Sequence, residues 1–167
     1  MTRRIFKHTG SLQPGRSSFD LSYEKKFTCD MGQLIPVMCD EAVPGDIWTI
    51  GNQTVIRFNP LVSPVLHEIN MYLHIFFVPY RLLWEDWEDF ITGGPNGTDA
   101  SVFPTITTDN GTSWDVGSLA DYLGIKPDVS GAQVSALPFR GYALIWNEYF
   151  RDQDLQAETV FSHTVNI

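Results

Sequence analysis

The sequence of 167 residues predicts a mainly β domain with helical insertions. One long segment, residues 66–78, alternates apolar and polar positions with a period of two, which is typical of a strand with one face on a core. The period changes to that of a helix at residues 81–91, and again from Pro138 onwards. Hydrophobic residues make up 43% of the chain, enough for one sizeable core in a single domain.

The first 26 residues form a basic arm in an acidic protein. They carry six basic and two acidic side chains, a net charge of +4, whereas the whole chain has a formal charge of −9. Turn residues without periodicity predict that residues 1–26 are extended, followed by the main domain at 27–167. Four cations, Arg3, Arg4, Lys7 and Arg16, are the candidate nucleic-acid-binding residues. Docking on an acidic partner surface, or simple solvation, remains open.

Short strands are predicted after the arm. Residues 33–38 are short and mainly apolar, but Pro36 removes a ladder donor and restricts this segment to a sheet edge or a bulge. Residues 43–46 contain Pro-Gly-Asp and predict a turn. Residues 47–50 and 54–58 are rich in β-branched and aromatic side chains and flank Gly51-Asn52, which together predict a hairpin.

The strand predicted over residues 66–78 has one strongly apolar face. At ~3.3 Å per residue it would span roughly 40 Å, a length that suits a large sandwich or barrel. The even positions Glu68, Asn70, Tyr72 and His74 are polar or amphipathic, whereas the odd positions are predicted to pack in the core or against another subunit. These odd residues are Ile69, Met71, Leu73, Ile75 and Phe77.

Three helices are predicted after Pro79. In the first, residues 81–91, Trp84 and Trp87 lie on an apolar face that packs in the core or between subunits, and the chain leaves the helix at Gly93-Gly94. Its acidic face is predicted to be solvated or to meet cations of a neighbouring subunit. This face comprises Glu85, Asp86, Glu88 and Asp89. The second helix, residues 115–123, is closed by Gly124.

The third helix opens at Pro138, a favourable first helical position. It carries an aromatic stripe with the spacing i, i+3, i+4, i+7 and i+8, which predicts a packing face in the core or at a subunit contact. The stripe consists of Tyr142, Ile145, Trp146, Tyr149 and Phe150.

The sequence does not favour an enzyme, a cofactor or a metal. It contains no nucleophile elbow, phosphate-binding loop or dinucleotide fingerprint. His67 and His74 are seven residues apart on one predicted strand and therefore point to opposite faces. Cys29 and Cys39 lack zinc spacing and are expected to be free, buried thiols in a reducing compartment. No apolar run is long enough to span a bilayer, and the N-terminus does not resemble a signal peptide, so no membrane partner is expected.

Several ordered blocks resemble a known family. They are Gly32-Gln33-Leu34-Ile35-Pro36, Val43-Pro44-Gly45-Asp46, Arg57-Phe58-Asn59-Pro60-Leu61-Val62-Ser63-Pro64, His74-Ile75-Phe76-Phe77-Val78-Pro79-Tyr80-Arg81-Leu82-Leu83-Trp84, Trp87-Glu88-Asp89-Phe90-Ile91-Thr92-Gly93-Gly94 and Ile145-Trp146-Asn147-Glu148-Tyr149-Phe150-Arg151-Asp152-Gln153. This pattern resembles the N-terminal portion of the major capsid protein of microviruses, small single-stranded-DNA bacteriophages, and especially of the gokushovirus branch.

The resemblance implies a viral jelly-roll β-barrel, incomplete in this chain because capsid proteins of the family are considerably longer. We therefore expect a fragment, a truncated reading frame or a prophage remnant. The implied role is that of a structural subunit of a small icosahedral shell, with other copies, the single-stranded DNA genome and other phage structural proteins as partners. The implied location is the virion, and the host bacterial cytoplasm during assembly. The alternative is a small phage DNA-binding or accessory protein that acts through its basic arm.

Overall fold

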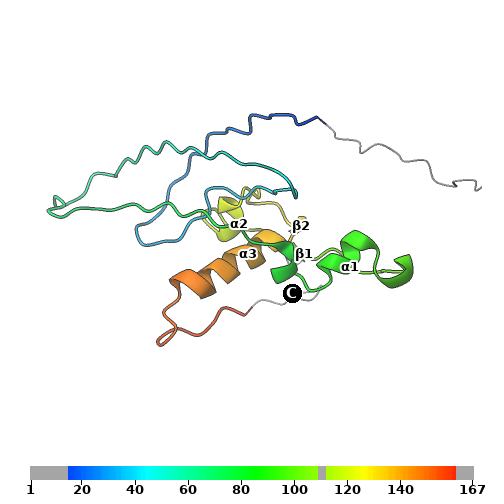
Figure 1. The fold of residues 1–167 in the computed structure, drawn as a ribbon. Coiled ribbons are helices and arrows are strands. Elements are labelled where there is room, and N and C mark those ends of the chain that lie inside the picture. The colour runs from blue at the N-terminus through cyan, green and yellow to red at the C-terminus, as the bar shows by residue number, and fades with distance from the viewer. Residues whose placement is uncertain (1–14, 109–111, 161–167) are drawn as a thin grey trace, which may run out of the picture.

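The structure, a computed structural model, describes residues 15–108 and 112–160. Short helices and a small sheet gather together, and long segments without regular structure reach away from them (Figure 1). The elements in chain order are η1 (Tyr80–Leu82), α1 (Trp87–Thr92), η2 (Pro95–Gly97), β1 (Thr105–Thr107), α2 (Leu119–Tyr122), β2 (Gln133–Ser135), α3 (Leu137–Ile145) and the π-helix η3 (Trp146–Phe150). β1 and β2 pair antiparallel, with Ile106 opposite Val134.

The core is small and aromatic. Leu83, Trp84 and Leu137 form its centre, and the Trp84 side chain is 0% exposed. Phe103 meets the Trp84 ring edge-on, with ring centroids 5.7 Å apart, an arrangement that adds to the stabilisation from burial alone. The residues packed around this centre are Val78, Tyr80, Trp87, Phe103 and Leu144.

The helix ends follow local sequence signals. α1 ends at Gly93, which has a φ of 85°, as predicted, because glycine takes this left-handed conformation without a steric penalty. The predicted helix over residues 81–91 is split into η1 and α1, and at the break both Leu83 and Trp84 are buried. Packing of these two side chains therefore outweighs helix continuation. In the second predicted helix, only α2 is helical; the Ser118 hydroxyl caps it by accepting from the Asp121 N–H.

The third helix begins as predicted, with Pro138 in its first turn. Its last turn widens into η3, where the Arg151 N–H donates to the Trp146 carbonyl at 2.9 Å. The most buried face differs from the predicted aromatic stripe, since the stripe is half-buried at four positions and Tyr149 is 69% exposed. The buried residues of α3 and η3 are Leu137, Arg140, Gly141, Ala143 and Asn147.

The strands predicted before Pro79 are not formed, whereas the turn at residues 43–46 is present. Its Asp46 N–H donates to the Val43 carbonyl at 3.0 Å. Residues 33–38 and the predicted hairpin and long strand, at 47–58 and 66–78, contain no β-ladder. Residues 47–78 make no backbone–backbone hydrogen bond with any other described residue. A strand requires a partner to satisfy its backbone, and the described residues provide none there.

Candidate interaction surfaces

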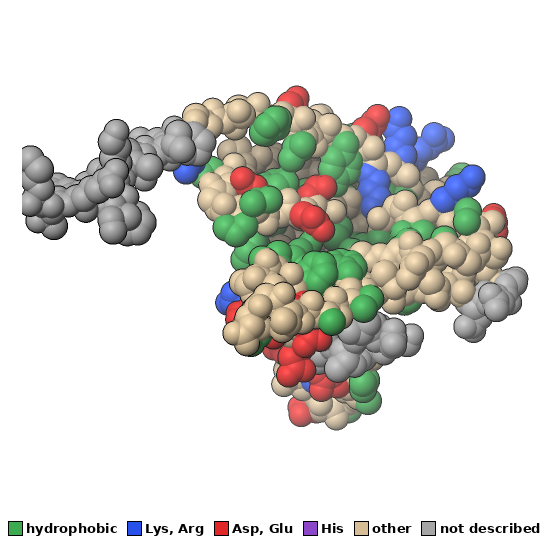
Figure 2. Space-filling view, turned by 90° about the vertical axis from the view of Figure 1, so that its right-hand side faces the viewer, with side chains coloured by type: hydrophobic (Ala, Val, Ile, Leu, Met, Phe, Trp, Pro, Cys, Tyr) green, Lys and Arg blue, Asp and Glu red, His purple; other side chains and the backbone are tan. Residues whose placement is uncertain are grey.

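Residues 47–78, which we call the ribbon, expose many apolar side chains. Between residues 69 and 77 the odd-numbered side chains, which we call the odd face, are exposed from 41% at Ile69 to 79% at Phe77, and the residues of this face are Ile69, Met71, Leu73, Ile75 and Phe77. Hydrophobic side chains extend across the molecular face shown in Figure 2. The ribbon thus combines exposed apolar side chains with unpaired backbone groups, and both favour contact with further chain. Packing of the odd face against another subunit stays a prediction.

The even side of the ribbon forms an aromatic patch with η3, comprising Tyr72, His74, Phe76, Tyr149 and Phe150. His74 stacks beside Tyr72 and Phe76 along the ribbon, with centroids 6.3 and 6.1 Å away. Phe76 then meets Tyr149 at 4.9 Å. No contact was predicted from the sequence for the even positions, and the aromatic rings at Tyr72, His74 and Phe76 were the available signal for one. The patch joins the ribbon to the helical part of the chain.

The predicted packing residues outside the ribbon occupy two environments. Trp84 lies fully in the core, and Trp87 is half-buried, with its ring 4.6 Å from that of Tyr80. Tyr142, Trp146 and Phe150 are half-buried as well. Half-buried aromatic side chains leave area for contacts with other chains, so a subunit contact at the stripe also stays a prediction.

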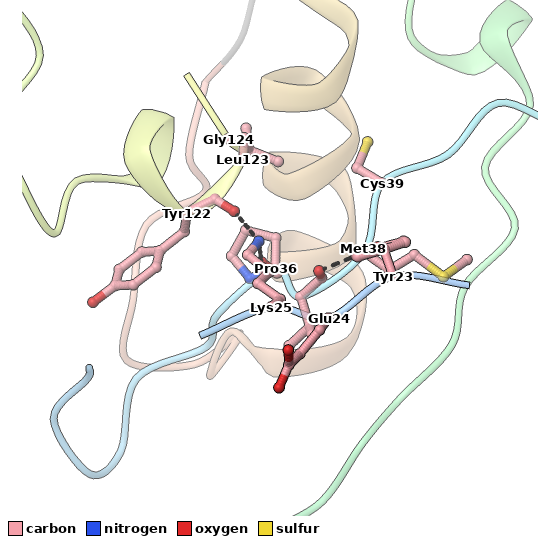
Figure 3. A pocket seen from close by; sticks show the side chains of 10 residues that line it. Tyr23, Glu24, Lys25, Pro36, Met38, Cys39, Tyr122, Leu123 and Gly124 are labelled. Atoms are coloured by element: carbon pink, nitrogen blue, oxygen red, sulfur yellow. Dashed lines mark hydrogen bonds between the residues drawn. The ribbon is translucent and has the colours of Figure 1, made fainter. Parts of the chain in front are cut away.

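Residues 22–37, which we call the strap, cross α2 and α3 by hydrogen bonds to backbone carbonyls. Lys25 Nζ donates to the Pro36 carbonyl at 3.0 Å and also to the Tyr122 carbonyl at the end of α2 (Figure 3). The Tyr122 hydroxyl donates in return to the Thr28 carbonyl at 2.9 Å. Further along, the Tyr142 hydroxyl donates to the Leu34 carbonyl at 2.8 Å. None of the strap residues is buried, so these bonds, more than apolar packing, fix its path.

Desolvation shifts the pKa values of several titratable groups in this region. Burial lowers the pKa of the Lys25 ammonium and raises the pKa of the Tyr142 hydroxyl. Burial also raises the pKa of the Cys39 thiol, which therefore holds less of the reactive thiolate. The expectation of buried thiols is nevertheless wrong, because the residues Cys29 and Cys39 are free and exposed on a segment that is hydrogen-bonded to the surface. Lys25 and Tyr142 thus hold the strap through hydrogen bonds to backbone carbonyls.

The charged side chains of the described residues form few ion pairs with one another. Among the described residues the ion pair Lys26–Glu24, at 3.3 Å, is the one salt bridge, and both partners are exposed. The acidic side chains of α1 and the preceding turn are solvated, with Asp86 half-buried. Arg16 is exposed, whereas Arg3, Arg4 and Lys7 lie outside the described residues. A DNA contact through the arm therefore stays a prediction.

The described part of the chain contains no group of three or more His, Cys, Asp and Glu side chains arranged for a metal ion. His74 belongs to the aromatic patch, and His67 Nδ1 lies 3.2 Å from the Glu68 carbonyl. Within residues 15–108 and 112–160, no helix has the length and apolar character to cross a membrane.

Two buried polar residues were not singled out from the sequence. Arg140 is 1% exposed, and its Nη1 donates to the Leu83 carbonyl at 3.0 Å. Asn147, 3% exposed, hydrogen-bonds to Thr159. They are seven residues apart on one helical face with the small residues Gly141 and Ala143, and this spacing was the available signal.

The main surface features of the described residues are the exposed apolar ribbon, the aromatic patch and the hydrogen-bonded strap. All three are suited to contacts between chain segments. A family model described as capsid protein (F protein) matches residues 9–164, and the chain belongs to this family. The relatives described next confirm the predicted resemblance to microvirus capsid proteins.

Three relatives are capsid proteins of small phages and viruses, each described as capsid protein VP1. The protein of Chlamydia phage 1 is 40% identical over 149 residues, covering 84% of this chain and 25% of the relative. That of Bdellovibrio phage phiMH2K is 38% identical over 152 residues, covering 90% and 28%. That of Spiroplasma virus 4 is 32% identical over 146 residues, covering 86% and 26%. The chain thus spans about a quarter of the length of the relatives it matches.

Proposed function

We propose that this chain is the N-terminal part of the structural subunit of a small icosahedral bacteriophage capsid that encloses single-stranded DNA. The observation that carries the proposal is the ribbon, whose apolar side chains are exposed and whose backbone lacks partners among the described residues. An isolated soluble domain would bury such a segment, whereas one part of a larger β-structure presents it to the rest. Family membership supports the same role.

The ribbon is well suited to contribute two strands to a jelly-roll barrel. Of its two limbs, residues 47–58 have the β-branched and aromatic composition of strands, and residues 66–78 have their alternation. Barrel closure would pair the backbone and bury the odd face at once. Since relatives are about four times as long as the matched region, the remaining strands would come from sequence that this chain does not contain.

The partners proposed for this subunit are other copies of the capsid protein, together with the DNA genome and other phage structural proteins. The subunit would act in the virion, and in the host bacterial cytoplasm during assembly, without a cofactor and without catalysis. The half-buried stripe of α3 and η3 offers aromatic area for neighbouring copies, because aromatic residues are enriched at the buried centres of interfaces.

A chimera tests the proposal. The matching region of the Chlamydia phage 1 capsid protein is replaced by residues 9–164, and particle formation is followed by sedimentation and electron microscopy. We expect closed particles like those of the unmodified protein. A chimera that is folded and soluble but remains unassembled, beside a parent that assembles, would contradict the proposal.

A matched pair of variants tests the ribbon within the same chimera. Leu73→Asp places a charge on the odd face, and we expect it to abolish particles, because burying an unpaired charge is strongly unfavourable. Val62→Asp places the same charge at a fully exposed position between the limbs and is expected to leave assembly intact. Equal assembly of both variants would show that the odd face is not buried.

A further inference from the structure

The chain reverses direction after η3 and returns beside the helix it has just left. Residues 152–156 make the turn, in which the Gln156 N–H donates to the Asp152 carbonyl at 2.9 Å. The Asp152 carboxylate accepts from the N–H groups of Asp154 and Leu155, at 3.0 and 3.3 Å. Residues 157–160, the return segment, then run back below α3 in the view of Figure 1.

Asn147 binds this return segment through two hydrogen bonds to Thr159. Its Nδ2 donates to the Thr159 carbonyl at 2.8 Å, and its Oδ1 accepts from the Thr159 N–H at 3.0 Å. One side-chain amide therefore satisfies both backbone groups of a single residue, as a neighbouring strand would do. Asn147 is 3% exposed, so these bonds lie out of water, where an unpaired amide would be costly.

The position of the Asn147 side-chain amide is also fixed by the helix that carries it. Asn147 is the second residue of η3, and it follows the buried positions Arg140 and Ala143 on the inward face of the helix. At the start of the turn, Arg151 Nη1 donates to the Gln156 carbonyl at 2.9 Å, which fixes the approach of the return segment. By contrast, the Thr159 side chain takes part in neither bond with Asn147.

We propose that Asn147 is a positioning residue: a clamp that recognises the backbone of Thr159 and sets the direction in which the chain leaves the helical part. The clamp requires the backbone N–H and C=O of residue 159 and does not depend on the side chain of that residue. Opening of the clamp would release residues 157–160 without unfolding α3. This role is independent of the capsid function proposed above.

Backbone protection provides the first test. In the 167-residue chain, hydrogen exchange at the Thr159 amide is compared between wild type, Asn147→Leu and Glu148→Ala. Asn147→Leu keeps the side-chain volume close and removes both bonds to Thr159, together with the bond of 3.5 Å from Nδ2 to Glu158 Oε1. We expect exchange about tenfold faster or more, as for loss of about 1.4 kcal/mol. Glu148→Ala changes the exposed neighbour and should leave exchange unchanged. A Thr159 amide that is unprotected in the wild type overturns the proposal.

Exchange of the Asn147 side-chain amide tests the clamp from the side of the return segment, where substitutions leave the helices untouched. The Asn147 Nδ2 protons are followed by nuclear magnetic resonance, and those of the exposed Asn52 serve as the internal reference. Thr159→Pro deletes the backbone N–H donor, and we expect exchange of the Asn147 Nδ2 protons to become several-fold faster; Thr159→Ala should leave it at the wild-type rate. Equal rates for the proline and alanine variants, or faster exchange with alanine alone, would refute recognition of the backbone.

Discussion

Replacement of Trp84 by alanine removes the largest fully buried side chain of the described residues. The side chain is 0% exposed and contacts three aromatic rings, with centroids 5.1 Å away at Phe90, 5.7 Å at Phe103 and 6.2 Å at Trp87. Deleting a buried indole removes its transfer free energy and leaves a cavity, so we expect Trp84→Ala to lower the free energy of unfolding by about 3–5 kcal/mol.

The indole nitrogen sharpens this prediction. Trp84 Nε1 is buried without an acceptor among the described residues, a situation that costs on the order of 1–3 kcal/mol. Trp84→Phe removes that donor and keeps an aromatic ring in the core. We therefore expect Trp84→Phe to cost clearly less than Trp84→Ala, by about 2 kcal/mol.

Urea denaturation followed by far-ultraviolet circular dichroism measures both changes, since tryptophan fluorescence itself would differ between the variants. Phe77→Ala is the control, because its ring is 79% exposed and its loss should alter the midpoint little. A Trp84→Ala midpoint equal to that of Phe77→Ala would refute the assignment of the core. A Trp84→Phe midpoint as low as that of Trp84→Ala would refute the argument from the unpaired indole.

Three further predictions concern the strap and the basic arm. Lys25→Met should increase the backbone mobility of residues 22–37, measured as lower ¹⁵N order parameters, because it removes the bonds to the Pro36 and Tyr122 carbonyls. Lys26→Met, at a side chain that is 80% exposed, should leave these order parameters unchanged, and equal values in the two variants would contradict the role of Lys25. The pKa of Tyr142 is raised in the folded chain, so its contribution to stability is fully present below the unfolded pKa near 10 and is lost as pH rises through the folded value. The urea midpoint should thus fall more between pH 9 and 11 in wild type than in Tyr142→Phe, and parallel curves would count against this effect. Replacing Arg3, Arg4, Lys7 and Arg16 by Gln should abolish a salt dependence of single-stranded DNA binding with a log–log slope of roughly −3, from about −0.7 per phosphate contact. An unchanged slope together with impaired assembly would assign the arm to protein docking.

Some turns and helix ends were predictable because each depends on a few neighbouring residues. Gly93 ends α1 as predicted, through a bond that spans four residues. The turn at residues 43–46 is local in the same way. The start of α2 was not predicted, because Ser118 caps it after the predicted start at residue 115. The strands were predicted from side-chain alternation, yet a ladder also needs hydrogen-bond partners, and alternation contains no information about where those partners lie.

The packing of α3 shows a second limit of structure prediction from the sequence. Spacing identifies two candidate faces, an aromatic one and a face of small and polar residues, and hydrophobicity favours the first. The structure buries the second more deeply, because Arg140 reaches the Leu83 carbonyl and Asn147 reaches Thr159. Both contacts join residues that are distant along the chain or separated by a reversal, so helical periodicity could not reveal them.

The position of the ribbon along the chain has a consequence for synthesis. Its apolar residues leave the ribosome before η3, whose Tyr149 and Phe150 complete the aromatic patch. Roughly 70 more residues must be added after the ribbon before that contact is available, which takes about 4–14 s at ~5–20 residues per second. During this interval His74 and Phe76, the side chains of the ribbon that contact η3, have no partner there. The growing polypeptide is therefore most prone to associate with its neighbours on a polysome before the helical part of the domain exists.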